Sequence, residues 1–212
     1  MSRRLPVYIL ADTSGSMSGA PIQAVNTGIQ TLIDTLRMDP QALESAYISL
    51  ITFSTSAKPE VPLSDLVNFQ APTLQAGGGT SMWQALRLAA DQAKSELITR
   101  SGEAKGDYKP LLFLLTDGYA TDEEGDALEQ FNSVRWGVKV ACGAGSNVSH
   151  DTLKRISDVT LKIETDGQRF KEFFKWVTQS IKTVSNSKVT EAAGDQSPES
   201  VLASIPGVIE IV

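Results

Sequence analysis

The sequence lacks the residues that several common protein chemistries require. Its 212 residues include one cysteine, Cys142, and one histidine, His150. No internal disulfide can form, and a zinc site, which would favour His and Cys ligands, is nearly excluded. A Ser-His-acid triad would depend on His150, and there is no Gly-x-Ser-x-Gly nucleophile elbow. A Gly-x-x-x-x-Gly-Lys-[Ser/Thr] phosphate loop is also missing, which argues against an NTPase.

Long apolar runs and a basic charge balance are absent as well. No window approaches the length of a membrane span, and residues 7–11 are too few for the apolar region of a signal peptide. The formal net charge of -6 argues against non-specific binding to nucleic acid, which needs a basic surface. We therefore expect a cytoplasmic protein that binds neither membrane nor nucleic acid.

Short apolar runs alternate with helical patterns along the chain. Strands are predicted over residues 6–11, 46–53, 58–63, 111–115, 138–142 and 159–163, and helices over 21–36, 82–97, 122–134, 149–156 and 170–184. This alternation predicts an α/β fold with a doubly wound, mostly parallel six-stranded sheet in the order 3-2-1-4-5-6, flanked by helices. Two prolines, Pro59 and Pro62, place the third strand at an edge of the sheet, and the expected fold has one antiparallel edge strand.

The length favours one large domain, which we place at residues 1–184. Residues 185–200 are polar and have the composition of a linker, whereas residues 201–212 are apolar again. This tail can pack back on the domain or dock onto another molecule. Because exposed apolar tails tend to aggregate, we expect it to pack on the domain.

Two of the predicted strands end in an aspartate, Asp12 and Asp117. Ligands of doubly wound sheets bind at the carboxyl ends of the strands where the strand order reverses, so both acids are expected in one crevice. Ser14 and Ser16 follow Asp12 at alternate positions, and Thr80 comes from a third loop. Carboxylate and hydroxyl oxygens are the ligands that Mg²⁺ and Mn²⁺ prefer, and Ca²⁺ is also compatible with them.

Each of these motifs also has a purely local explanation. Asp-x-Ser-x-Ser can be an N-capping turn, Thr80 can cap the helix that follows it, and residues 116–118 can form an ordinary turn. Three such coincidences on loops that meet at one switch point are improbable together. The pattern as a whole therefore predicts a metal site.

The same residues carry a resemblance to a known family. Asp12-x-Ser14-x-Ser16, Thr80 after a Gly-rich loop, and Asp117 between Thr and Gly resemble the metal-ion-dependent adhesion site (MIDAS) of von Willebrand factor A domains. The resemblance extends from about residue 6 to residue 184. The stretches RRLPVYILADTSGSM, GGGTSMWQAL and LLFLLTDGYATD resemble the bacterial TerY-like branch, which is associated with tellurium resistance and stress response.

The resemblance implies a role for each motif residue. Ser14, Ser16 and Thr80 would bind the ion directly, and Asp12 and Asp117 would bind it directly or through water. A sixth position would stay open for an Asp or Glu of a cytoplasmic partner protein. The resemblance thus implies a binding module and not an enzyme, with a partner in a tellurite or stress-response system such as a kinase–phosphatase pair.

Two other interpretations stay open at this point. The first is a Mg²⁺-dependent phosphohydrolase, or another hydrolase, on a similar fold. Such a phosphohydrolase needs a second acid two residues after its nucleophilic carboxylate, and the residue two after Asp12 is Ser14. The second interpretation is a structural relic, in which the fold is kept for packing and the metal site is silent.

Overall fold

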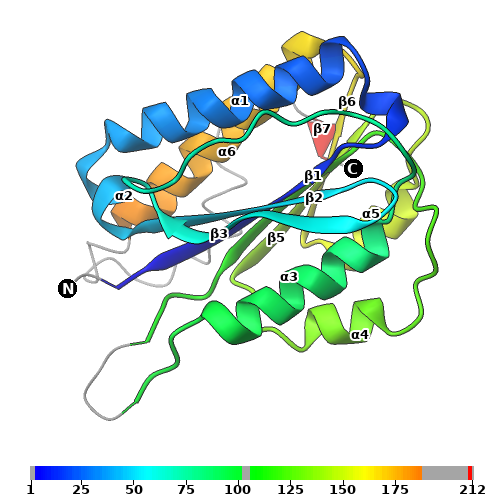
Figure 1. Cartoon of the computed structure of the whole chain (residues 1–212). Coiled ribbons are helices and arrows are strands. Elements are labelled where there is room, and N and C mark those ends of the chain that lie inside the picture. The colour runs from blue at the N-terminus through cyan, green and yellow to red at the C-terminus, as the bar shows by residue number, and fades with distance from the viewer. Residues whose placement is uncertain (1–2, 102–105, 188–209, 212) are drawn as a thin grey trace.

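The computed structural model describes residues 3–101, 106–187 and 210–211. Among these residues seven strands form one sheet in the order β3-β2-β1-β4-β5-β6-β7 (Figure 1). The strands are β1 (Leu5–Asp12), β2 (Ala46–Phe53), β3 (Ala57–Asp65), β4 (Leu111–Thr116), β5 (Val138–Ala144), β6 (Val159–Ile163) and β7 (Glu210–Ile211). All neighbours pair in parallel except the two edge strands, β3 and β7, which are antiparallel.

The order of the six predicted strands is confirmed, and so is the antiparallel edge position of β3. The sequence pattern missed β7, which pairs Glu210 with Lys162 and Ile211 with Leu161 of β6. A strand of two residues is too short to produce an alternation of apolar and polar side chains. Residues 188–209 and 212, which make up most of the predicted linker and tail, lie outside the described residues.

Helices cover both faces of the sheet (Figure 1). One face carries α1 (Ala20–Arg37), α2 (Pro40–Ser45) and α6 (Gly167–Ser187), and the other carries α3 (Met82–Glu96), α4 (Ala127–Asn132) and α5 (His150–Ile156). Side chains of β1 alternate between the two layers: Val7 and Ile9 pack towards α1 and α6, whereas Tyr8 and Leu10 pack towards α3. Both faces are therefore buried, which explains the continuous apolar runs of the central strands.

Two further features concern the single cysteine and the helices. Cys142 on β5 is fully buried, and burial raises the pKa of its thiol, so it is a residue of the core. None of the helices in the described part of the chain is both long and apolar enough to cross a membrane.

The acidic segment at residues 122–126 does not begin a helix, although the sequence pattern predicted one from Asp122. The helix α4 begins only at Ala127. The two carboxylate oxygens of Asp122 instead accept hydrogen bonds from the backbone amides of Trp83 (3.3 Å) and Gln84 (2.8 Å), at the N-terminus of α3. The negative charge of Asp122 therefore lies at a helix N-terminus, where it is favourable, but the helix is α3, which is distant from Asp122 in sequence.

A second helix boundary also differs from the prediction. Asp39 and Pro40 do end α1, but they begin the short helix α2 at once. Asp39 Oδ1 accepts hydrogen bonds from the amides of Gln41 and Ala42, both at 3.1 Å, and Pro40 occupies the first helical turn, where a missing N–H is harmless. The Asp39 carboxylate also lies 3.4 Å from Lys182 Nζ on α6.

We expect Asp39→Ala to lower the free energy of unfolding by about 1 kcal/mol, the usual loss for an N-cap. Burial raises the pKa of Asp39, but the amides and Lys182 outweigh it, so the pKa lies below its ordinary value. The carboxylate therefore stabilises the fold fully above the unfolded-state pKa of about 4, and its contribution is lost as the pH falls below that. Urea denaturation at neutral and acidic pH measures both effects.

The matched variant is Asp39→Asn, which keeps a good N-cap but loses the attraction to Lys182. Its loss is expected to be about 0.5 kcal/mol or less, because the ion pair is near the surface. Equal losses for the two variants would show that the ion pair, and not the cap, carries the contribution.

Candidate metal centre

The topology of the sheet brings the two aspartates of the predicted site together. Strands β1 and β4 are adjacent and parallel, with Ala11 opposite Leu115. Asp12 and Thr116 therefore leave the sheet side by side, and Asp117 follows directly. This edge also carries the 3-10 turn η1 (Gly15–Met17) and the N-terminus of α1, at the right of Figure 1.

Asp12 is fully buried at the tip of β1. Its Oδ1 accepts a hydrogen bond from the amide of Ser14 at 2.8 Å, and its Oδ2 accepts one from the hydroxyl of Thr116 at 2.6 Å. Both carboxylate oxygens are thus engaged with neighbouring loops. Asp12 fixes the turn that presents the serines and links that turn to β4.

The two serine hydroxyls form a continuous chain of oxygens with the second aspartate. Ser14 Oγ lies 3.0 Å from Ser16 Oγ, and the Ser16 hydroxyl donates a hydrogen bond to Asp117 Oδ1 at 2.6 Å. In an octahedral Mg²⁺ shell with bonds of about 2.1 Å, adjacent oxygens are about 3 Å apart. The spacing of the serine oxygens therefore fits two neighbouring positions of such a shell.

Thr80 reaches the same edge from a third loop. Its amide donates to Thr121 Oγ1 at 2.8 Å, and its carbonyl accepts from the amide of Thr121 at 2.9 Å. A methyl group added at Gly118 would lie 3.6 Å from Thr80 Oγ1, which places this hydroxyl beside the residue that follows Asp117. Within the described chain the Thr80 hydroxyl forms no hydrogen bond, so its oxygen is free to bind an ion.

The glycines before Thr80 have a defined structural role. The amide of Gly15 donates to the carbonyl of Gly78 at 3.0 Å, and the amide of Gly77 donates to the carbonyl of Thr13 at 2.8 Å. Gly78 has a φ of 82°, and a Cβ there would lie 2.2 Å from Thr55 Oγ1. The segment is therefore not merely a flexible turn, because it fixes the Thr80 loop against the Asp12 loop.

The charges of the site are not balanced by a basic side chain. Burial raises the pKa of both Asp12 and Asp117, and the nearby charge of Asp117 raises that of Asp12 further, although hydrogen bonds from Ser14 and Thr116 act in the opposite direction. Across residues 3–101 and 106–187, no lysine or arginine forms an ion pair with either carboxylate. Two buried acids without a cationic partner suit a bound cation.

The donor set also indicates which kind of ion it suits. No group of three or more His, Cys, Asp and Glu side chains comes together in the described residues. The site consists of two carboxylates and three hydroxyls, which is a hard-oxygen set with few charges. Such a set fits Mg²⁺ or Mn²⁺ better than an ion that needs several anionic or sulfur ligands.

Two threonines support the site, although the sequence-based prediction did not name either of them as a site residue. Thr116 donates to Asp12, and Thr121 holds both backbone groups of Thr80. Thr116 carries a detectable signal, since it is a polar residue at the tip of the apolar run 111–115. Thr121 carries none, because its contact with Thr80 spans 41 residues.

Comparisons with known proteins find a matching family model and several relatives. The family model for the von Willebrand factor type A domain matches residues 7–181. An uncharacterized protein of Synechocystis sp. is 29% identical over 165 residues, which are 73% of this chain and 36% of that protein. The inter-alpha-trypsin inhibitor heavy chain H4 of Homo sapiens is 29% identical over 167 residues, or 71% of this chain and 17% of the relative. The chain thus spans about a third or less of these relatives.

Solved structures share the fold. A von Willebrand factor type A protein from Catenulispora acidiphila has a TM-score of 0.65 at 20% identity, over 86% of this chain and 43% of that one. Proximal thread matrix protein 1 from the mussel byssus, with a zinc-occupied MIDAS motif, has a TM-score of 0.61 at 16% identity, over 86% of this chain and 46% of that one.

We expect Gly78→Ala to destabilise the protein by at least about 1 kcal/mol, because a left-handed φ strains a residue with a side chain and the new Cβ would clash with Thr55. Divalent-metal affinity should fall too, because the Thr80 loop would shift.

Gly77→Ala is the matched control, since nothing lies within 4 Å of its Cβ, and its effect should stay within about 0.5 kcal/mol. Chemical denaturation and metal titration measure both quantities, and similar losses for the two variants would contradict the assigned role.

We expect Asp117→Asn to separate metal binding from folding. Removing one of two buried like charges relieves desolvation and repulsion, so the metal-free variant should be at least as stable as the wild type. We expect Mg²⁺ to raise the melting temperature of the wild type but not that of the variant, because the stabilisation by a ligand follows its affinity for the folded state. Calorimetry with and without Mg²⁺ tests this, and a variant that is less stable without metal but still stabilised by it would contradict the expectation.

Proposed function

The chain belongs to the von Willebrand factor type A domain family, and we propose that it is a docking module in which a bound Mg²⁺ ion takes an acidic side chain from a partner protein. The observation that carries the proposal is the chain of closely spaced oxygens from Ser14 through Ser16 to Asp117. The carboxylates of Asp117 and Asp12 are both buried and have no cationic partner among the described residues. Membership of the family supports an interaction role.

The residues divide into ion ligands and residues that hold them. Ser14, Ser16 and Thr80 would bind the ion through their hydroxyls. Asp12 has both oxygens occupied by hydrogen bonds, so it would act mainly by holding the Ser14 turn and through a water molecule. Asp117 would accept from Ser16 and bind the ion directly or through water. Mostly neutral ligands leave the ion under-neutralised, and a carboxylate from outside gains a strong charge-assisted contact.

The proposed physiological metal is Mg²⁺, with Mn²⁺ and Ca²⁺ as alternatives of the same ligand preference. The mussel protein named above holds zinc in its MIDAS motif. Zinc therefore belongs in the same titration, even though His and Cys ligands play no part here. Affinity of an oxygen site rises from Mn²⁺ to the later metals, so affinity alone does not identify the ion used in the cell.

An enzymatic function receives less support. A phosphohydrolase of the type considered above needs a second acid two residues after its nucleophile, and Ser14 occupies that position. It also needs a lysine for the phosphate, and no lysine in the described chain pairs with Asp12 or Asp117. We therefore propose that the chain is not an enzyme.

The biological setting is proposed from the TerY-like resemblance. The motif stretches around Asp12, Thr80 and Asp117 carry that resemblance, which suggests a cytoplasmic role in tellurite resistance or stress response. The partner would be another cytoplasmic protein that offers an Asp or Glu, such as a kinase or phosphatase of that system. Neither nucleic acid nor membrane is a proposed partner.

We expect isothermal titration to show one Mg²⁺ or Mn²⁺ site in the metal-free wild type and none in the Asp12→Ala/Ser14→Ala double variant. The double variant removes one direct ligand and the carboxylate that holds its turn. Ser18→Ala is a matched control, because Ser18 is exposed and lies outside the oxygen chain. Binding that survives in the double variant would place the ion elsewhere.

The same variants test docking. Proteins retained by the immobilised wild-type chain from a lysate of its source cells should be released by EDTA and should not bind Ser14→Ala, whereas Ser18→Ala should retain them. A partner that is unaffected by both EDTA and Ser14→Ala would count against a metal-dependent interaction.

A further inference from the structure

A small pocket lies next to the metal centre, on the side of α3 and α5. Its volume is about 200 Å³. Met82 and Trp83 line it from the start of α3, Val148 and Leu153 from the β5–α5 region, and Ala120 from the segment after β4. Most of its lining side chains are apolar, whereas α5 and the residue before it contribute hydroxyl groups, and polar atoms make up about half of the exposed lining. The pocket plays no part in holding the proposed ion.

The pocket and the metal centre share a residue. Gly118 follows Asp117 and lines the pocket, and a methyl group on it would lie 3.6 Å from Thr80 Oγ1. Met82 lies two residues after Thr80 and forms another wall. One wall of the pocket is therefore next to Thr80, one of the proposed ion ligands.

An exposed aromatic residue stands at this pocket. Tyr119 is 59% exposed and lines it. The large hydrophobic residues exposed in the described part of the chain are Met38, Leu43, Val67, Ile98 and Tyr119. Tyr119 is the one aromatic residue among them, and it is next to the functional site. Tyrosines with an apolar ring and a polar tip are enriched among the residues that dominate binding energy at protein interfaces.

The walls of the pocket are held in place. Asp122 accepts from the amides of Trp83 and Gln84, and Thr121 is paired with the backbone of Thr80. The Arg155 guanidinium lies 6.0 Å from the centre of the Trp83 ring and forms an ion pair with Glu124. A pocket with fixed walls loses little conformational freedom on binding and can therefore select among side chains.

We propose that this pocket binds an apolar side chain of the partner, at a position one or two residues from the acid that completes the metal site. The inference rests on the proposed docking function and specifies the partner's recognition sequence. Small-molecule sites usually enclose about 300–1,000 Å³, so this pocket is better matched to one side chain. Consecutive Cα atoms are about 3.8 Å apart. When the partner's acid is bound at the metal centre, the side chain one or two residues away from it can therefore reach past Gly118 into the pocket.

The test is a peptide array in which a central Asp is fixed and each flanking position, up to two residues away, is varied in turn. The array is probed with the wild-type chain in Mg²⁺ and again in EDTA. We expect Mg²⁺-dependent binding that is about tenfold or more stronger for peptides with Leu, Ile, Met or Phe beside the Asp than with Gly or Ser, as burial of one apolar side chain predicts.

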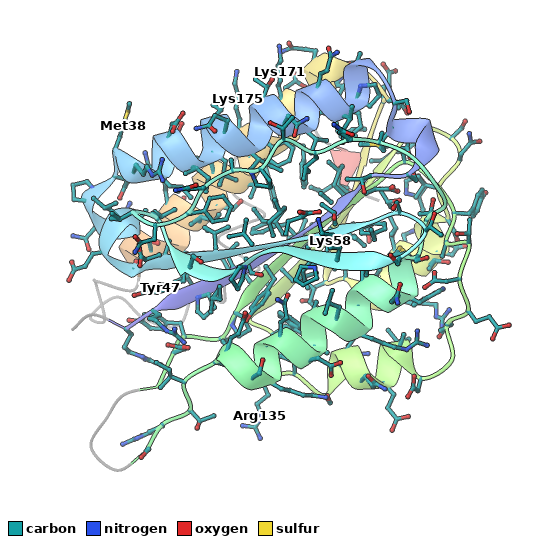
Figure 2. All side chains as sticks on the ribbon, in the orientation of Figure 1. Met38, Tyr47, Lys58, Arg135, Lys171 and Lys175 are labelled. Atoms are coloured by element: carbon teal, nitrogen blue, oxygen red, sulfur yellow. The ribbon has the colours of Figure 1, made fainter. Side chains whose placement is uncertain are left out.

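Two variants connect this preference to the pocket. Ala120→Phe fills it from its wall, and Tyr119→Ala removes its exposed ring, which supports no buried packing. Both should lose the preference for apolar neighbours while the Mg²⁺ affinity stays that of the wild type. Met38→Ala is the control, because Met38 is 83% exposed and lies at the far end of α1 (Figure 2).

The possible outcomes separate the two levels of the proposal. Mg²⁺-dependent binding that is equal for all flanking residues would overturn the role of the pocket and leave metal-dependent docking intact. A preference that persists unchanged in both pocket variants would place the apolar contact elsewhere and also overturn it. If no Asp peptide binds in a Mg²⁺-dependent way while the titration shows a bound ion, the acidic-partner function fails, and this inference fails with it.

Discussion

The burial of two carboxylates without a cationic partner is the constraint on which the rest of the site depends. Asp12 and Asp117 sit at the tips of adjacent parallel strands, where the sheet topology leaves them little freedom to separate. In a medium of low dielectric constant such a pair is costly unless hydrogen bonds or a cation compensate for it. Thr116 and the serines supply the hydrogen bonds, and a divalent ion would supply the charge.

Hydrogen bonds between the loops at the carboxyl ends of the strands connect the parts of the site to one another. The Asp12 loop is tied to the glycines before Thr80, and Thr80 is tied to Thr121 beyond β4. Asp122 extends the same connection to the N-terminus of α3. Each loop is therefore positioned by residues that are distant in sequence, and an ion bound at this edge would stabilise all three loops together.

Regular patterns were predictable from the sequence, and contacts between distant segments were not. Buried strands produce apolar runs, their alternation with helices indicates a doubly wound sheet, and the common strand order of such sheets predicted that Asp12 and Asp117 lie together. The start of α4, by contrast, depends on Asp122 capping a helix about 40 residues away, which no local pattern records. The same applies to Thr121 and to the two-residue strand β7. That Asp12, Ser14, Ser16, Thr80 and Asp117 bind an ion stays a prediction.

The two antiparallel edge strands, β3 and β7, also affect whether a strand of another chain can pair with the sheet. At one edge, β3 carries Pro59 and Pro62 together with the ion pair between Lys58 and Glu60, and at the other, the part of β7 that the structure describes pairs over two residues. Prolines, charged side chains and very short strands all disfavour the addition of a further strand from another chain. Extension of the sheet by a strand of another chain is thus disfavoured at β3, and the docking proposed above depends on side chains at the carboxyl ends of the strands and not on backbone pairing.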